Sequence, residues 1–222
     1  MPDTPARIDP GVYDIPLQLD ASLEPGRPAL RETLLAAQRR LREFACKHGW
    51  EAHVQQPFAL QAHIYEAKAG FDYDLLAISG MDTTIELPET YCAALENNIL
   101  MSVSPELYQR LFPEGKEADS FEKLLTHEMA HRLHIRILKG DEEAMGPVWF
   151  YEGFALVAAS QFEGRAPHLS EEEIWDVVDA QERGSYILYA SVLRTFLGKT
   201  DLQRLVEMAG KPDFVDWLRT IL

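Results

Sequence analysis

The chain has 222 residues, 46% of them hydrophobic, which is enough for one large domain or for one domain with two lobes. Its formal net charge of −15 argues against nucleic acid and against anionic membranes as partners, because both need a basic surface. The sequence contains no apolar run that approaches the length of a membrane-spanning helix.

The beginning of the chain and its cysteines predict a cytoplasmic protein. Residues 1–16 hold prolines and aspartates in place of a basic region followed by an apolar one, so they are not a secretory signal. Cys46 and Cys92 are too few for a disulfide framework, and we expect both to be buried free thiols.

The first half of the sequence predicts a mixture of helix and strand. Residues 1–28 carry six prolines and predict an extended amino-terminal lead-in. Helical spacing of apolar residues predicts a helix over 29–48 and a shorter one over 105–112. Strand signals, separated by turn residues, fall around 51–54, 60–67, 73–79, 84–87 and 98–103.

After Gly115 the strand signals stop and helical patterns take over. The expected helices cover 120–139, about 147–163, 170–183, 185–197, 200–209 and 212–221. This change of pattern predicts an α+β fold with a first lobe over about 29–140, a helical second lobe over about 141–222, and a cleft between them.

The helix expected over 120–139 contains the sequence Thr-His-Glu-Met-Ala-His, an HExxH motif. A helix stacks His127 and His131 on one face, where both imidazoles can reach one zinc ion. Glu128 then projects beside the metal and can take a proton from a water molecule. Asp119 is the expected N-cap, with Glu122 completing a capping box. The alternative is an amphipathic helix whose histidines lie on a solvated face.

A catalytic zinc site needs a third protein ligand. His134 lies roughly 10 Å along the helix axis from His127, too far to share one ion with both other histidines, so we expect it to be packed or solvated. Residues 141–143 are acidic but suggest a solvated loop. Glu152 stands in an otherwise apolar helix, where a carboxylate requires a partner or a metal, so it is the predicted third ligand. The alternative is a salt bridge to an arginine such as Arg194.

These motifs together resemble a known family. HExxH followed by residues 149–155, Trp-Phe-Tyr-Glu-Gly-Phe-Ala, resembles the gluzincin metallopeptidases, and in particular the alanyl aminopeptidase family with its W-x-x-E-G-F-A motif. Metzincins would need a glycine at 134 and a histidine at 137, where this chain has His134 and Ile137.

Two further segments extend the resemblance, which covers residues 30 to 205. Residues 93–97, Ala-Ala-Leu-Glu-Asn, are similar to the G-A-M-E-N substrate strand, with Leu95 in place of methionine. Residues 186–193 resemble the helix that begins with a catalytic tyrosine in Y-x-K-G, where Leu188 and Tyr189 replace the lysine and the glycine.

The resemblance implies a zincin-like two-lobe domain, with a small mixed sheet and helices followed by an all-helical carboxy-terminal lobe. It also implies one Zn²⁺ held by His127, His131 and Glu152, with Glu128 as the general base. Tyr186 would stabilise the oxyanion, with Tyr189 as its rival; the alternative for Tyr186 is a tyrosine with a structural partner.

The implied function is a zinc-dependent metallopeptidase that acts on a peptide or protein substrate, as an aminopeptidase if Glu96 holds the substrate's amino terminus. Glu96 could equally be a solvated turn residue. The alternatives are an endopeptidase with a dedicated protein substrate and a non-catalytic binding protein of zincin fold. The intact Glu128 argues against the latter, and the sequence predicts no oligomeric state.

Overall fold

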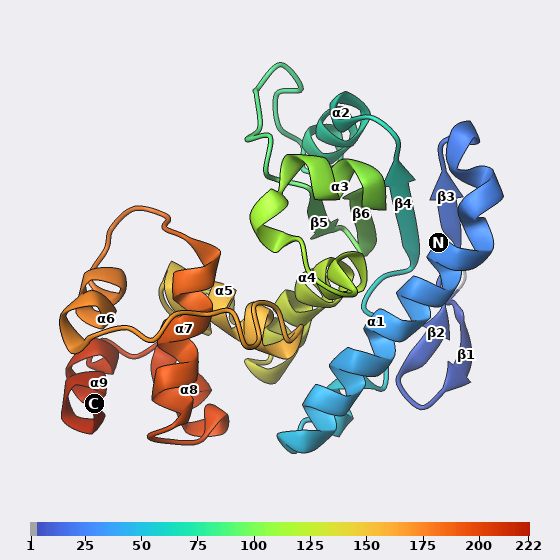
Figure 1. Cartoon of the computed structure of the whole chain (residues 1–222). Coiled ribbons are helices and arrows are strands. Elements are labelled where there is room, and N and C mark those ends of the chain that lie inside the picture. The colour runs from blue at the N-terminus through green and yellow to red at the C-terminus, as the bar shows by residue number, and fades with distance from the viewer. Residues whose placement is uncertain (1–3) are drawn as a thin grey trace.

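The computed structural model describes residues 4–222, which form a mixed α+β fold with the strands in the first half. Figure 1 shows the sheet and its helices on one side of a central helix, α4 (Ser120–Ile137), and a group of helices on the other. The change from mixed structure to helices that the sequence predicts is confirmed.

The amino-terminal segment is more structured than an extended lead-in. Strands β1 (Ala6–Asp9) and β2 (Val12–Asp14) pair as an antiparallel ribbon. The third strand, β3 (Leu17–Leu19), pairs in parallel with β4 (Gln61–Tyr65) and so belongs to the main sheet. A short 3₁₀ helix, η1 (Ala21–Gly26), then leads into the long helix α1 (Arg27–Lys47). Residues 1–3 of the predicted lead-in lie outside the described part of the chain.

The main sheet has the strand order β3-β4-β6-β5, so β5 (Ala93–Glu96) lies at one edge. Strand β6 (Ile99–Val103) pairs in parallel with β4 and antiparallel with β5. The β5–β6 turn consists of Asn97 and Asn98, both with positive φ, as a tight hairpin requires. The strands expected around 60–67 and 98–103 are therefore confirmed.

Three other expected strands are wrong. Residues 51–54 form a 3₁₀ helix, η2 (Glu51–Val54), and 73–79 lie mostly in the helix α2 (Lys68–Ile78). That helix buries Phe71, Leu75 and Leu76, whose spacing defines one helical face. Residues 84–87 lie in a loop instead, where the Asp82 side chain accepts hydrogen bonds from the main-chain and side-chain donors of Thr84.

The expected helices are confirmed, with some shifted ends. Helix α5 ends five residues before the predicted limit, because Ser160 and Phe162 adopt positive φ and turn the chain away. Besides α2 and α4, the α-helices are α1 (Arg27–Lys47), α3 (Pro105–Leu111), α5 (Val148–Ala158), α6 (Glu171–Val178), α7 (Tyr186–Leu197), α8 (Leu202–Ala209) and α9 (Phe214–Ile221). Single 3₁₀ turns, η3 (Pro113–Gly115) and η4 (Glu143–Met145), precede α4 and α5.

The expected capping box of α4 is wrong. Asp119 adopts the left-handed conformation with φ 56°, so it does not present its side chain to the first turn in the usual way. Glu122 instead accepts a hydrogen bond from Arg40 of α1, with 2.8 Å between the atoms. This ion pair joins α4 to α1 where a local cap was expected.

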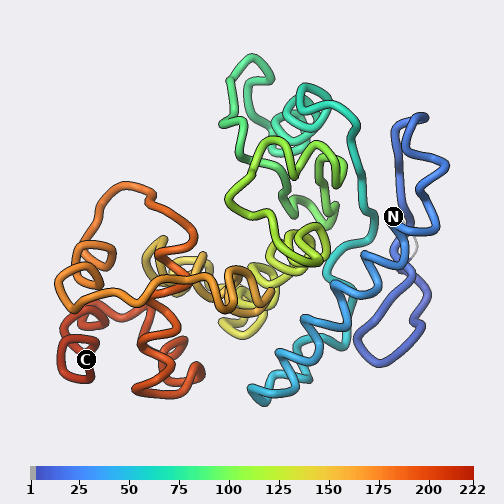
Figure 2. Tube along the Cα trace, in the orientation of Figure 1, coloured from blue at the N-terminus to red at the C-terminus, as the bar shows by residue number. Residues whose placement is uncertain are grey.

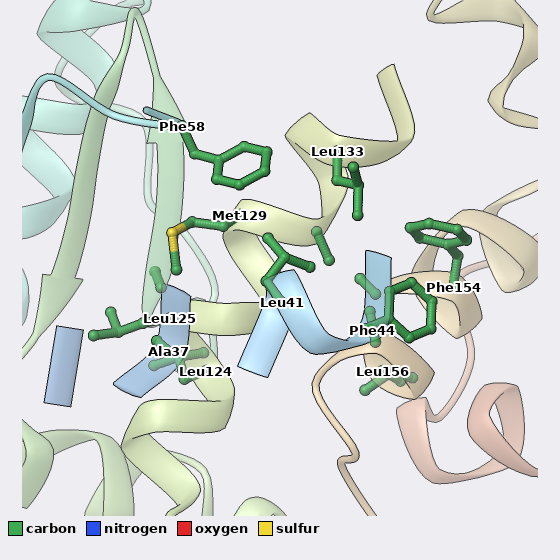
Figure 3. Close-up of a cluster of buried hydrophobic side chains, with 14 of the residues drawn as sticks. Ala37, Leu41, Phe44, Phe58, Leu124, Leu125, Met129, Leu133, Phe154 and Leu156 are labelled. Carbon is green, nitrogen blue, oxygen red and sulfur yellow. The ribbon is translucent and has the colours of Figure 1, made fainter. Parts of the chain in front are cut away.

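One face of α4 is part of the main hydrophobic core. Leu125, Met129 and Leu133 are at most 1% exposed and pack in the cluster that contains Leu41 of α1 (Figure 3). His127 follows Leu125 by two positions, and His131 follows Met129 by two positions. A step of two residues corresponds to a rotation of about 200° around a helix, so the histidines lie nearly opposite the buried stripe. Burial of this stripe therefore turns the side of α4 that carries residues 127 and 131 away from α1.

The two ends of the described chain lie far apart, with the amino-terminal strands beside α1 and helix α9 at the opposite end of the molecule (Figure 2). Within residues 4–222, no helix combines the length and the apolar character needed to span a bilayer. Both cysteines in this part of the chain are free thiols. Cys92 is buried as expected, but Cys46 is exposed on the outer side of α1, so that expectation is wrong.

Candidate metal centre

Helix α4 directs its two motif histidines at the same point. The His127 and His131 rings lie 4.7 Å apart, and their Nε2 atoms are 3.1 Å apart. His127 is 5% exposed and His131 is partly buried, so the pair does not lie on the solvated face that was the alternative. Two imidazole lone pairs at this distance repel each other unless a proton or a cation lies between them.

Glu152 of α5 supplies the third electron-rich atom. Its Oε2 lies 3.1 Å from Nε2 of His127 and 3.6 Å from Nε2 of His131. Ligands that surround a zinc ion tetrahedrally at 2.0–2.1 Å are about 3.3 Å from one another. The three donor atoms thus have the spacing of three corners of such a site, and this buried group could hold a metal ion.

Gln161 holds the His127 ring in the required form. The Oε1 atom of Gln161, which is 4% exposed, lies 2.9 Å from Nδ1 of His127. An amide oxygen only accepts hydrogen bonds, so Nδ1 carries a proton, and whenever the ring is neutral Nε2 keeps its lone pair. Hydrogen bonding of the second ring nitrogen is the usual support for a metal-ligating histidine.

Glu152 also makes a salt bridge, but to Arg183 and not to Arg194. Arg183 donates a hydrogen bond to Oε1 of Glu152, whereas Arg194 donates to the main-chain oxygen of Gln161. Burial alone would raise the pKa of Glu152, but hydrogen bonds and charge from the two histidines bring it well below its usual range. Glu152 is therefore an anion in the protein interior, as a metal ligand must be.

Glu128 lies beside the three donor atoms, at the point where two cavities meet. It is partly buried, and this burial raises the pKa of Glu128 to about 7, with the charge of His127 opposing the shift. A carboxylate with that pKa can both take up and release a proton near neutral pH.

The two candidate tyrosines have different surroundings. Tyr186 lines the larger cavity, its ring lies 6.0 Å from that of His127, and its hydroxyl accepts a 2.7 Å hydrogen bond from Arg183. Burial raises the pKa of Tyr186, so its hydroxyl keeps its proton and can donate it. Tyr189 is 3% exposed, and its hydroxyl accepts a hydrogen bond from the main chain of Gly184. The structure thus places Tyr186 beside the histidines and gives Tyr189 a structural partner.

His134 is a packed core residue and lies away from the metal centre, as its spacing predicts. Its ring is fully buried and stacks on Phe154, with 4.4 Å between the ring centres. Neither ring nitrogen has a hydrogen-bond partner within residues 4–222.

The cavities on the two sides of Glu128 differ in size. The larger, of about 580 Å³, contains His127, Arg183 and Tyr186 and has mainly apolar walls. The smaller, of about 250 Å³, contains His131 and Glu96. Strand β5 borders both cavities, with Ala93 on the larger and Glu96 on the smaller.

Comparison with protein-family models, curated proteins and solved structures gives no match to this chain.

The sequence did not predict two residues of the centre, Arg183 and Gln161. Both lie in connecting segments, where apolar periodicity gives no direction for a side chain. A weak signal for Gln161 existed, since a metal-ligating histidine needs a partner for its second nitrogen, but several polar residues near the end of α5 met that description. Nothing in the sequence around Arg183 indicated contact with Glu152.

Proposed function

We propose that this protein is a zinc-dependent peptidase of the gluzincin type, with a zincin-like two-lobe fold. The observation that carries the proposal is the convergence of three donor atoms from His127, His131 and Glu152, beside a carboxylate on a cleft. Two imidazoles and one carboxylate are a donor set typical of catalytic zinc.

The chain's own residues then divide the work of hydrolysis. When bound, zinc polarises the peptide carbonyl and lowers the pKa of water. Glu128 takes the proton of the attacking water and delivers it to the leaving amine. Tyr186 donates a hydrogen bond to the carbonyl oxygen as that oxygen gains charge. The protonated state of the Tyr186 hydroxyl supports this role.

The position of β5 supports an extended peptide as the substrate. An edge strand offers unpaired main-chain groups to an added strand, and β5 runs from the larger cavity to the smaller one past Glu128. A peptide whose amino terminus meets Glu96 would run antiparallel to β5 and place its later residues in the larger cavity.

The same arrangement favours an aminopeptidase over an endopeptidase. The cavity on the Glu96 side is the smaller, at about 250 Å³ against about 580 Å³, so it offers room for few residues before the cleaved bond. The Glu96 carboxylate in this smaller cavity suits the ammonium group at the amino terminus of a peptide.

Metal content and peptide hydrolysis test the proposal together. The purified protein should contain about one Zn²⁺ per chain and hydrolyse unmodified peptides. Glu128→Gln should keep the zinc and lower kcat by roughly 10²-fold or more, because only the base is removed. Glu122→Gln on the same helix is the matched control and should keep full activity, since Glu122 pairs with Arg40 away from the cleft. If the Glu128→Gln variant binds zinc and hydrolyses peptides as fast as the unmodified protein, the proposed mechanism is contradicted.

A further inference from the structure

Arg183 contacts two groups of the centre with a single nitrogen. It lies between α6 and α7, and its Nη2 donates hydrogen bonds both to Oε1 of Glu152 and to the hydroxyl of Tyr186. Its guanidinium carbon also lies 5.5 Å from the centre of the Tyr186 ring. The Arg183 side chain is 52% exposed, so the remaining donors face the larger cavity and solvent.

The contact with Glu152 gives the two carboxylate oxygens different tasks. Oε2 faces the histidine nitrogens at 3.1 and 3.6 Å, whereas Oε1 is held by Arg183. A free carboxylate can bind a metal through one oxygen or through both. With Oε1 engaged by a cation, Glu152 offers one oxygen only, which keeps a coordination position open for substrate or water.

The contact with Tyr186 directs the hydroxyl hydrogen. The Tyr186 oxygen accepts from Arg183, so its own hydrogen must point elsewhere than toward the guanidinium. The remaining direction is the cavity that Tyr186 lines. Arg183 thereby sets the orientation that a hydrogen bond to a substrate oxygen would require.

We propose that Arg183 is a positioning residue that holds Glu152 as a one-oxygen metal ligand and aims the Tyr186 hydroxyl into the cavity. The metal part follows from the donor geometry alone, whereas the Tyr186 part rests on the proposed peptidase function. The alternative is that the Arg183 cation neutralises Glu152 in place of a metal ion and so competes with metal binding. The two roles predict opposite changes in metal affinity when Arg183 is replaced.

The test compares Arg183→Met and Arg183→Lys with a matched control, Arg219→Met. Arg219 has a similar setting, because it pairs with Asp179 at 2.7 Å and lies 4.2 Å from the centre of the Trp175 ring, yet it is part of no catalytic or binding group. Zinc affinity is measured by competition with a chromophoric chelator. The absorption spectrum of the Co²⁺-substituted protein reports the number and arrangement of ligands independently of activity.

Arg183→Met should weaken zinc binding by about 10- to 100-fold and change the Co²⁺ spectrum, while Arg219→Met should leave both unchanged. Arg183→Lys should fall between, because an ammonium keeps the charge but lacks the planar geometry. Zinc binding by Arg183→Met that is unchanged or tighter would overturn the proposal. If that variant does not fold, a wild-type affinity and Co²⁺ spectrum in Arg183→Lys would overturn it.

Steady-state kinetics test separately whether Arg183 orients the Tyr186 hydroxyl. Arg183→Met, assayed with saturating zinc, should lose kcat by roughly 10-fold or more with little change in KM, because the hydroxyl acts in the transition state. A change confined to KM would overturn this part. If the unmodified protein hydrolyses no peptide, the proposed function fails, whereas the affinity and Co²⁺ measurements still decide the role of Arg183 at the metal.

Discussion

Individual side chains in this protein have environments that decide what they can do, and the two tyrosines at the start of α7 illustrate this. Both begin α7, only three residues apart, and either could match the tyrosine of the resembled family. Tyr186 faces the cavity and accepts from Arg183, whereas Tyr189 is buried and accepts from the main chain of Gly184. Sequence spacing could not separate them because both lie within the first turn of the helix.

Replacing each tyrosine by phenylalanine should therefore give different results. In the proposed mechanism, Tyr186→Phe should lower kcat by roughly 10²-fold with little change in the free energy of unfolding, because it removes the hydroxyl that would donate a hydrogen bond in the transition state. Tyr189→Phe should cost about 1 kcal/mol of stability, from the lost hydrogen bond, and keep kcat. Steady-state kinetics and urea unfolding of both variants measure this, and the reverse pattern would assign the catalytic role to Tyr189.

His134 should make stability depend on pH. Burial, with a smaller contribution from His131, lowers the pKa of His134 to about 3 from an ordinary 6.5. Below pH 6.5 the unfolded chain takes up a proton that the folded chain does not accept until about pH 3. Stability is thus fully present above pH 6.5 and falls by up to about 1.4 kcal/mol for each pH unit below it.

His134→Leu should remove this dependence. Urea unfolding between pH 7 and 5 should show a smaller loss of stability in the variant than in the unmodified chain, by on the order of 1–2 kcal/mol at pH 5. His168→Leu is the control, because His168 is exposed and its replacement should leave the pH dependence unchanged. A variant with the pH dependence of the unmodified chain would mean that His134 does not remain neutral in the core.

The helices of the second half pack so closely that a single methyl group matters. A Cβ added at Gly153 of α5 would lie 3.2 Å from the main-chain oxygen of Tyr189 and 3.2 Å from Cβ of Leu193, both on α7. This close approach brings α7, and with it Tyr186, beside Glu152. Gly153 is thus explained by packing between two helices.

Gly153→Ala should lower stability by about 1–3 kcal/mol through overpacking, although alanine is the better helix former. It should also weaken zinc binding, because α5 must shift at the residue next to Glu152. Gly70→Ala in α2 is the matched control, since its new Cβ would only reach ordinary contact with Tyr65 at 3.4 Å. The control should be neutral or stabilising by about 0.5–1 kcal/mol. Equal effects in both variants would contradict the packing argument.

How well the sequence predicted each element depended on how local its stabilisation is. Long helices such as α1 and α4 carry their apolar stripe in their own residues and were predicted. Residues 73–79 are a short apolar run, which fits a strand and a helix equally well, and the choice of strand was wrong. Strand β3 has three residues and exists through its parallel pairing with β4, some 45 positions away along the chain, which no local pattern reveals.

The residues of the metal centre were likewise predicted where their signal is local in the sequence and missed where it is not. Spacing on one helix predicted His127 and His131, and the apolar context of α5 singled out Glu152. Arg183 and Gln161 could not be predicted, because their contacts depend on how two connecting segments fold over the donor atoms.

At the scale of the whole molecule, the two ends of the cleft carry opposite charges, and the proposed substrate specificity should depend on this difference. Glu96 lies on the smaller cavity and Arg183 on the larger one, so the proposed peptide substrate would meet an anion on one side of Glu128 and a cation on the other. The net charge of −15 would also attract the cationic end of such a peptide, although salt screens that attraction.

A free peptide and its N-acetylated form distinguish an aminopeptidase from an endopeptidase. Acetylation removes the charge that Glu96 would bind, so we expect most of the kcat/KM to be lost, and Glu96→Ala should abolish the difference between the two peptides. Glu106→Ala, an exposed change on α3, is the control and should preserve it. Equal cleavage of both peptides by the unmodified protein would indicate an endopeptidase and leave Glu96 without this role.

The covering of α5 by α7 has a consequence for synthesis on the ribosome. Eight of the eleven residues of α5 are buried, and the helix that covers Gly153 is made about 40 residues later. During that interval the nascent chain already carries both histidines and Glu152, yet it exposes its most apolar helix to other chains and to chaperones. We therefore expect release of the chain before Leu193 to yield an aggregating fragment, because the surface that α7 buries would stay open.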